Sequence, residues 1–158
     1  MNYRPNRFRS RKSTAIFANS KHYSAIVMDS FMKHILLIED DLDDQEIFLI
    51  ALANLGQLIA CETAVSAVEA LERLRSDEVK PDLIFLDLKM SGMHGFQFMN
   101  QLKLDPAFKK IPVVILSDSS DPLDIEMSKI AGSKRFITKP KDASALENAI
   151  KDSVQAFS

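Results

Sequence analysis

One stretch of the sequence decides the fold: Leu83-Ile84-Phe85-Leu86-Asp87-Leu88-Lys89-Met90. It follows Pro81-Asp82 and runs into Ser91-Gly92-Met93-His94-Gly95. Four apolar residues between a proline and two glycines predict a short buried strand. Asp87 is the first polar residue after that run. An isolated aspartate in this position more often simply ends a strand than takes part in chemistry, so its role has to be argued from the rest of the chain.

The chain on either side of this stretch alternates between apolar runs and amphipathic segments. Apolar strands that alternate with such helices indicate a parallel sheet that is covered on both faces. We therefore expect an α/β fold with a doubly wound, five-stranded parallel sheet. The strands are predicted at 35–38, 58–61, 83–86, 111–116 and 134–138, and the helices at 45–55, 65–74, 95–104, 122–131 and 143–154.

The first 33 residues differ in charge from the remainder. They carry seven basic residues against one acid, Asp29, which gives a net charge of +6. The remainder carries 13 basic and 21 acidic residues, which gives −8. We expect residues 33–158 to form one domain, and residues 1–32 to be a disordered basic arm, a leader that resembles a transit peptide, or a start-site artefact with Met32 as the true start.

Composition restricts the class of protein. An acidic folded part does not attract nucleic acid by its own charge. No apolar stretch approaches the ~20 residues that span a membrane. The single cysteine, Cys61, excludes an internal disulfide and has no cluster of His or Cys for zinc. It is typical of a reducing compartment, so we expect the protein in the cytoplasm.

Polar residues follow four of the five predicted strands. Glu39 and Asp40 follow the first strand, Asp87 the third, Ser117 the fourth and Lys139 the fifth. The carboxyl ends of parallel strands lie on one edge of the sheet, where ligands bind in a crevice. We therefore expect three carboxylates, a hydroxyl and an ammonium to meet there, and this makes Asp87 a candidate active-site residue.

The charges of this set indicate a chemistry. Three carboxylates in one place repel one another, and Mg²⁺, which prefers hard oxygen ligands, relieves that repulsion. With the ion in place, an anionic Asp87 can accept a phosphoryl group. Lys139 can neutralise the phosphoryl oxygens, and the Ser117 hydroxyl can donate a hydrogen bond to one of them. Individually, each of these residues also fits an ordinary surface or capping role.

Together these motifs resemble the receiver domains of two-component response regulators. The resemblance extends from Lys33 to about Ala156 and implies the flavodoxin-like receiver fold. The motifs that carry it are Leu37-Ile38-Glu39-Asp40-Asp41, Asp87-Leu88-Lys89-Met90-Ser91-Gly92-Met93-His94-Gly95, Leu116-Ser117 and Phe136-Ile137-Thr138-Lys139-Pro140.

The resemblance implies roles for the acidic residues. Asp87 matches the phosphoacceptor. Glu39 and Asp40 match the acidic pair that holds Mg²⁺ together with Asp87. Lys89, two residues after the acceptor, matches the position whose backbone carbonyl completes the metal site.

The resemblance also implies a switch. Ser117 matches the switch hydroxyl, Phe136 the switch aromatic and Lys139 the lysine that binds the phosphoryl group. Phosphate on Asp87 would then draw in Ser117, and Phe136 would turn inward. The face formed by the fourth helix, the fifth strand and the fifth helix would change shape, as in a two-state switch biased by a local charge.

Four positions depart from the commonest pattern of that family. Glu39 replaces an aspartate without a change of charge. Ser91 stands where proline is usual and His94 where aspartate is usual, and both should affect the loop more than the chemistry. Asp118 follows Ser117 where a small residue is usual. Because it adds a negative charge near the phosphoryl group, we expect it to modulate phosphorylation or dephosphorylation.

We therefore expect a single-domain response regulator that receives a phosphoryl group from a sensor histidine kinase or a histidine phosphotransfer protein. It would signal to a protein target, with a phosphorylation-dependent homodimer as one form of output, and would bind neither nucleic acid nor membrane. It would not be an enzyme beyond its own phosphorylation and dephosphorylation. One alternative is a receiver-like interaction module that is never phosphorylated. A remote alternative is a hydrolase of the haloacid dehalogenase type, which needs a second acid where this chain has Lys89.

Overall fold

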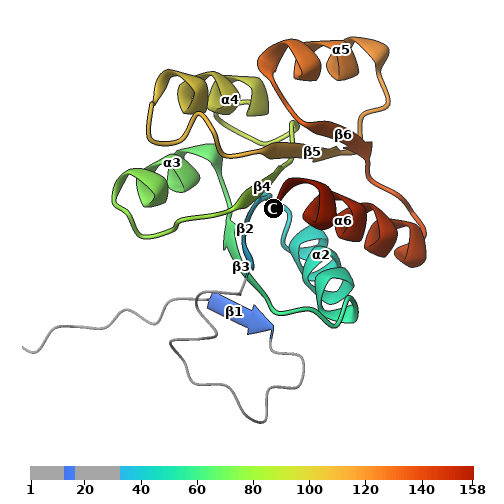
Figure 1. Cartoon of the computed structure of the whole chain (residues 1–158). Coiled ribbons are helices and arrows are strands. Elements are labelled where there is room, and N and C mark those ends of the chain that lie inside the picture. The colour runs from blue at the N-terminus through green and yellow to red at the C-terminus, as the bar shows by residue number, and fades with distance from the viewer. Residues whose placement is uncertain (1–12, 17–32) are drawn as a thin grey trace, which may run out of the picture.

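A computed structural model of the chain describes residues 13–16 and 33–158 (Figure 1). Five parallel strands form a sheet that a sixth, antiparallel strand extends, in the order β1-β3-β2-β4-β5-β6. The strands are β1 (Ser13–Ile16), β2 (Lys33–Ile38), β3 (Ile59–Ala64), β4 (Leu83–Leu86), β5 (Val113–Ser117) and β6 (Arg135–Thr138). The helices are α2 (Leu42–Asn54), α3 (Ala67–Arg75), α4 (Gly95–Leu104), α5 (Pro122–Ala131) and α6 (Ala143–Phe157).

The expected doubly wound parallel sheet is confirmed, and β1 is an addition to it. β1 pairs antiparallel with β3, with Ser13 opposite Glu62 and Ile16 opposite Ile59. Without β1, the outer edge of β3 would leave backbone groups without a strand partner, and such edges readily accept another strand. These four residues fall within the predicted basic leader, and Ser13-Thr14-Ala15-Ile16 contains no continuous apolar run that would predict a strand. The other residues predicted to form a leader, 1–12 and 17–32, lie outside the described part of the chain.

Most elements begin or end a few residues from the predicted positions, and the starts of α2 and β5 have a clear local reason. Helix α2 begins at Leu42, earlier than the predicted residue 45, because the Asp41 side chain caps it and accepts hydrogen bonds from the backbone N–H groups of Asp43 and Asp44. Strand β5 begins at Val113, later than predicted. The preceding Pro112 has no N–H to donate, although its carbonyl accepts a 3.0 Å hydrogen bond from the N–H of Ile84.

The sheet separates two apolar cores. Successive side chains of a strand point to opposite faces, so each buried strand contributes to both cores. Thus Leu36 and Ile84 lie in the core with α3, α4 and α5, whereas Leu37 and Phe85 lie in the core with α2 and α6. Figure 1 shows α2 and α6 together on one face of the sheet and α3, α4 and α5 on the other. This explains why the central strands β4 and β5 are apolar at successive rather than alternate positions.

The order of the strands determines where a ligand site can form. From β2 the chain passes outward to β3 and then returns to the opposite side of β2 as β4. The helices that follow β2 and β4 therefore lie on opposite faces, which opens a crevice at the carboxyl ends of these two strands. Within residues 33–158, no helix combines the length and the apolar character needed to cross a membrane.

Candidate functional site

Three acidic residues meet in the crevice between β2 and β4. Glu39, Asp40 and Asp87 each offer a carboxylate oxygen, and these oxygens lie within 4.8 Å of one another. Glu39 and Asp87 are buried, and Asp40 is partly exposed. The N–H of Asp87 donates a 3.0 Å hydrogen bond to the carbonyl of Ile38 and so joins the ends of the two strands. The structure thus brings together the three acids that the sequence analysis selected, at a spacing that one divalent cation can bridge.

Glu39 is held on both sides by the first residues of α2. Its Oε1 accepts a 3.0 Å hydrogen bond from the N–H of Asp41, and its backbone carbonyl accepts one of 2.6 Å from Nε2 of Gln45. Burial raises the pKa of the Glu39 carboxyl above its usual value, although the hydrogen bonds from Lys139 and Asp41 partly offset this effect. The Glu39 carboxylate is therefore preoriented, and it takes up a proton more readily than an exposed glutamate does.

Asp40 and Asp87 are oriented by the loop that follows β4. Asp40 Oδ2 accepts hydrogen bonds from the N–H of Ser91 at 3.2 Å and from its hydroxyl at 3.4 Å. Asp87 Oδ1 accepts a 3.1 Å hydrogen bond from the N–H of Lys89. Ser91 was expected to affect mainly the loop, but it also orients Asp40, because a proline in its place could donate neither hydrogen bond.

The same loop requires a glycine where it joins α4. A Cβ on Gly95 would lie 2.8 Å from Cδ2 and 3.0 Å from Cα of Leu88. Any larger residue would therefore displace the backbone next to Asp87. The start of α4 thereby positions the loop, with His94 as its N-cap.

Lys139 faces the acids from the end of β6. Its Nζ lies 2.7 Å from Oε2 of Glu39, 2.7 Å from Oδ2 of Asp44 and 3.5 Å from Oδ2 of Asp87. Burial by itself would lower the pKa of Lys139, but the hydrogen bonds to Asp44 and Glu39 and the charge of Asp87 outweigh it, and the net shift is upward. The ammonium therefore keeps its positive charge and is shared among several carboxylates.

Asp118 lies at the outer rim of the site. Its Oδ2 is 4.0 Å from Nζ of Lys139, and 73% of its side chain is exposed. Water screens an exposed charge of this kind. Asp118 is thus close enough to influence Lys139 but is not part of the buried cluster.

Ser117 ends β5 beside the cluster and is fully buried. Its Oγ accepts a 3.4 Å hydrogen bond from the N–H of Ser119, and its carbonyl accepts one of 2.8 Å from the N–H of Lys139. The Ser119 hydroxyl donates a hydrogen bond to the carboxylate of Asp124 in α5. The backbone carbonyl of Ser119 accepts a 3.0 Å hydrogen bond from Thr138 Oγ1. The residues at the end of β5 are thereby linked to the start of α5 and to β6.

Phe136 lies in β6 and is half-buried. It packs against the core that α3, α4 and α5 share with the sheet. Among the described residues, Asp44 and Gln45 contact site residues and were not predicted, whereas Ser91 was expected to affect the loop but not to contact Asp40. The run of acids from Glu39 to Asp44 could have indicated Asp44. No local pattern points to Gln45 or to the contact between Ser91 and Asp40.

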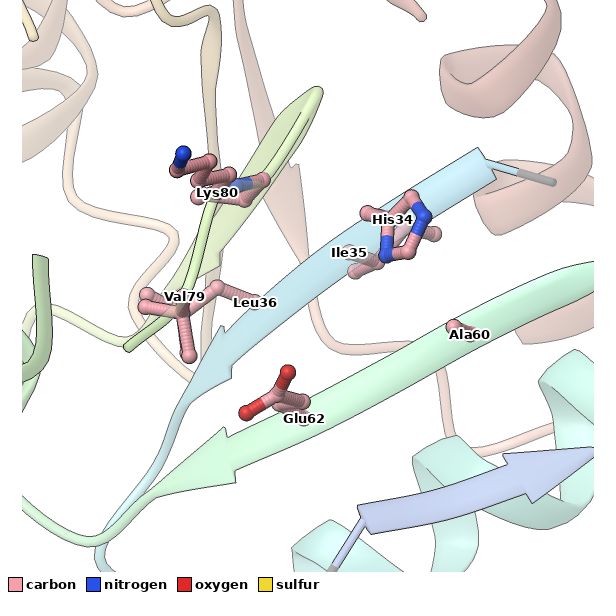
Figure 2. A pocket seen from close by; sticks show the side chains of 8 residues that line it. His34, Ile35, Leu36, Ala60, Glu62, Val79 and Lys80 are labelled. Carbon is pink, nitrogen blue, oxygen red and sulfur yellow. The ribbon is translucent and has the colours of Figure 1, made fainter. Parts of the chain in front are cut away.

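A hollow of about 250 Å³ adjoins the site between α2 and the start of α6. Glu39, Asp44 and Lys139 line its charged side, and Phe48 and Leu146 its apolar side. Figure 2 shows a second hollow, at the opposite end of β2, where His34, Glu62 and Lys80 lie around the strand. Its volume of about 10 Å³ has room for about one water molecule and not for a ligand.

Comparisons with known protein sequences agree with this geometry. The family model of the response regulator receiver domain matches residues 35–151. Protein PilG of Pseudomonas aeruginosa is 30% identical over 118 residues, which cover 73% of this chain and 86% of PilG. The DNA-binding response regulator MtrA of Mycobacterium tuberculosis is 32% identical over 115 residues, which cover 72% of this chain but only 46% of MtrA. The chain thus spans about half the length of MtrA, and the likeness extends to that part alone.

Solved structures show the same likeness. The phosphorylated cyanobacterial phytochrome response regulator RcpA superposes with a TM-score of 0.73 at 33% identity, over 80% of this chain and 94% of RcpA. The Mn²⁺-bound form of response regulator Rcp1 superposes with a TM-score of 0.67 at 25% identity, over 79% of this chain and 94% of Rcp1.

Proposed function

Because this chain belongs to the response regulator receiver domain family, we propose that it receives a phosphoryl group on Asp87 in a two-component phosphorelay. Members of this family are signalling modules rather than classical enzymes. The observation that carries the proposal is the setting of Asp87. Its carboxylate is buried at the end of β4, between two further acids and an ammonium 3.5 Å away.

The reaction we propose is a direct transfer from a phosphohistidine. A carboxylate oxygen of Asp87 attacks the phosphorus, a P–O bond forms, the P–N bond breaks and the imidazole leaves. Lys139 stabilises the negative charge on the phosphoryl oxygens. The hydrogen bond from the backbone N–H of Lys89 to Oδ1 holds the Asp87 carboxylate in one orientation. Positioning and electrostatics of this kind supply most of the catalysis in phosphoryl transfer.

The donor set also supports a metal ion. Receiver domains bind Mg²⁺ or Mn²⁺ at an acidic cluster. Here the side chains of Glu39, Asp40 and Asp87, with the backbone carbonyl of Lys89, are the ligands that we propose for Mg²⁺. When bound, the ion would offset the charge that the phosphoryl group adds.

The proposed output is a change at the face of α5, β6 and α6. The phosphoryl group would attract the Ser117 hydroxyl and break its hydrogen bond with the N–H of Ser119. Phe136, half-buried in β6, would turn into the space that is left. A local charge would thus bias two arrangements of one face.

The proposed partners follow from this scheme. A sensor histidine kinase or a histidine phosphotransfer protein would supply the phosphoryl group in the cytoplasm, and another protein, or a second copy of this chain, would bind the switched face. Lys89 argues against a haloacid dehalogenase, in which an acid is needed two residues after the nucleophile. A receiver-like interaction module that stays unphosphorylated is the remaining alternative.

One experiment separates these alternatives. The purified protein is incubated with acetyl phosphate and Mg²⁺, and its intact mass is measured. We expect a gain of one phosphoryl group that is lost in Asp87→Asn and when a chelator removes Mg²⁺. Reduction with borohydride followed by peptide mapping should place the group on Asp87. No gain with any small-molecule donor or histidine kinase would contradict the proposal and favour the unphosphorylated module.

A further inference from the structure

Lys139 makes its two shortest contacts away from Asp87. The distances from its Nζ are 2.7 Å to Glu39 Oε2 and 2.7 Å to Asp44 Oδ2, compared with 3.5 Å to Asp87 Oδ2. An ammonium group has three hydrogens to donate, and these point in fixed directions relative to one another. In this state two of them are engaged in short bonds to carboxylates other than that of Asp87.

From these contacts we infer that Asp44 is a positioning residue that competes with the incoming phosphoryl group for Lys139 and thereby slows the phosphorylation of Asp87. This inference rests on the proposed function, because it concerns the rate of the same transfer. Asp44 touches neither Asp87 nor the donor in this scheme. It acts through Lys139.

Asp44 differs from Glu39, the other acid that holds Lys139. Glu39 belongs to the three-acid cluster that could bind a cation, whereas Asp44 does not belong to that cluster. A cation bound by Glu39 would therefore compete with Lys139 for its carboxylate, whereas Asp44 would stay available to Lys139. Asp44 is the competitor that remains when the site is ready for transfer.

The local structure keeps Asp44 in place for this role. The N–H of Asp44 donates a 3.1 Å hydrogen bond to Asp41 Oδ1, which fixes the first turn of α2. The Asp44 side chain is 36% exposed, so it keeps its charge in contact with water while it reaches the less exposed Lys139. The ion pair is thus short, and water can reach its Asp44 side, so we expect that Lys139 can exchange this partner for a phosphoryl group during transfer.

The chain offers a matched control for this contact. Asp43 precedes Asp44 in the same turn of α2 and is exposed. Among the described residues, no ion pair joins Asp43 to Lys139. Asp43→Asn and Asp44→Asn remove the same charge from the same helical turn, and only the second substitution removes the charge that pairs with Lys139.

The test compares Asp44→Asn, Asp44→Glu and Asp43→Asn with the unsubstituted full chain. Initial rates of phosphorylation by acetyl phosphate are measured at saturating Mg²⁺, and Mg²⁺ binding is measured separately by calorimetry. Asp44→Asn should react about two- to fivefold faster, which is the range that a partly exposed ion pair can account for. Asp43→Asn should stay near the unsubstituted rate, and Asp44→Glu should retain the slow rate.

Two further readouts separate competition from a change of structure. The dissociation constant for Mg²⁺ should change no more in Asp44→Asn than in Asp43→Asn. The NMR signal of the Lys139 ammonium should show faster hydrogen exchange in Asp44→Asn only, because that variant loses one of the two short bonds.

Each other result overturns the inference. A rate for Asp44→Asn equal to or below that of the unsubstituted protein would mean that Asp44 does not compete for Lys139. Equal acceleration in Asp43→Asn would mean that only net charge matters. If the unsubstituted protein takes up no phosphoryl group, the proposed function fails and the inference falls with it. If the protein is phosphorylated but Asp44→Asn behaves as Asp43→Asn does, only the inference fails.

Discussion

Lys139 and the carboxylates around it control the site at the scale of single residues. Glu39 and Asp44 hold the ammonium at 2.7 Å, Asp87 lies 3.5 Å away, and the exposed Asp118 lies 4.0 Å away. A phosphoryl group on Asp87 would add negative charge to a site that already contains these four acids and Asp40. The rate of transfer should therefore depend on which of these acids keeps its contact with Lys139.

Asp118→Ala tests the weakest of these contacts. The substitution removes a negative charge from the rim, so phosphorylation by acetyl phosphate should become faster, by about twofold at most because the side chain is 73% exposed. The gain should disappear at high ionic strength, since salt screens exposed charges. The rates of phosphorylation and of phosphoryl loss are measured on gels that separate the two forms. If both rates are unchanged at low ionic strength, Asp118 has no modulating role.

At the scale of an element, the start of α4 controls the loop that carries Lys89 and Ser91. His94 is the N-cap, and its Nδ1 accepts a 3.3 Å hydrogen bond from the N–H of Phe96. The N–H of His94 in turn donates a 3.1 Å hydrogen bond to the side chain of Gln97. Histidine is not among the residues that cap helices best, whereas aspartate is.

His94→Asp should therefore stabilise the protein. A carboxylate is a better acceptor for the first N–H groups of the helix and interacts favourably with the positive end of its dipole. We expect the free energy of unfolding in urea to rise by about 0.5–1 kcal/mol. His94→Ala, which has no acceptor, should lower it by a similar amount. A decrease in His94→Asp would show that the contact between the His94 and Phe96 rings, whose centroids are 5.1 Å apart, matters more than the cap.

At the scale of the whole molecule, a metal ion bound by Glu39, Asp40 and Asp87 would link the carboxyl ends of β2 and β4. These neighbouring strands lie at the point where the order of the strands in the sheet reverses. A ligand that binds only the folded state stabilises it by mass action. The acidic cluster is incomplete in the unfolded chain, because Asp87 lies far in sequence from the adjacent Glu39 and Asp40. Stability should therefore report on metal binding independently of phosphorylation.

Mg²⁺ should raise the free energy of unfolding by about 2.7 kcal/mol at a hundred times its dissociation constant. Denaturant titrations with and without Mg²⁺ measure this increase, and Asp40→Asn should largely abolish it. The increase should shrink as the pH falls, because the pKa of Glu39 is raised and the residue takes up a proton at a higher pH than an exposed glutamate does. An equal increase in Asp40→Asn would show that the ion binds elsewhere.

The sequence by itself determined the sheet and the convergence of its polar ends. The apolar runs within β2, β4 and β5 are recognisable because a strand buried on both faces must be apolar at successive positions. The parallel arrangement then placed Glu39, Asp40, Asp87, Ser117 and Lys139 at one edge, and the structure brings them together there.

Only the tertiary structure decided which side chains complete the site. Hydrogen bonds join Lys139 to Asp44, Gln45 to Glu39, and Ser91 to Asp40. In addition, β1 pairs with the edge strand β3. The physical reason is that the two kinds of information depend on different distances along the sequence. Apolar periodicity is a local property that a short window of sequence displays. A hydrogen bond between residues as far apart as Asp44 and Lys139 instead depends on the directions of two side chains, which are defined only after the sheet and its helices have packed.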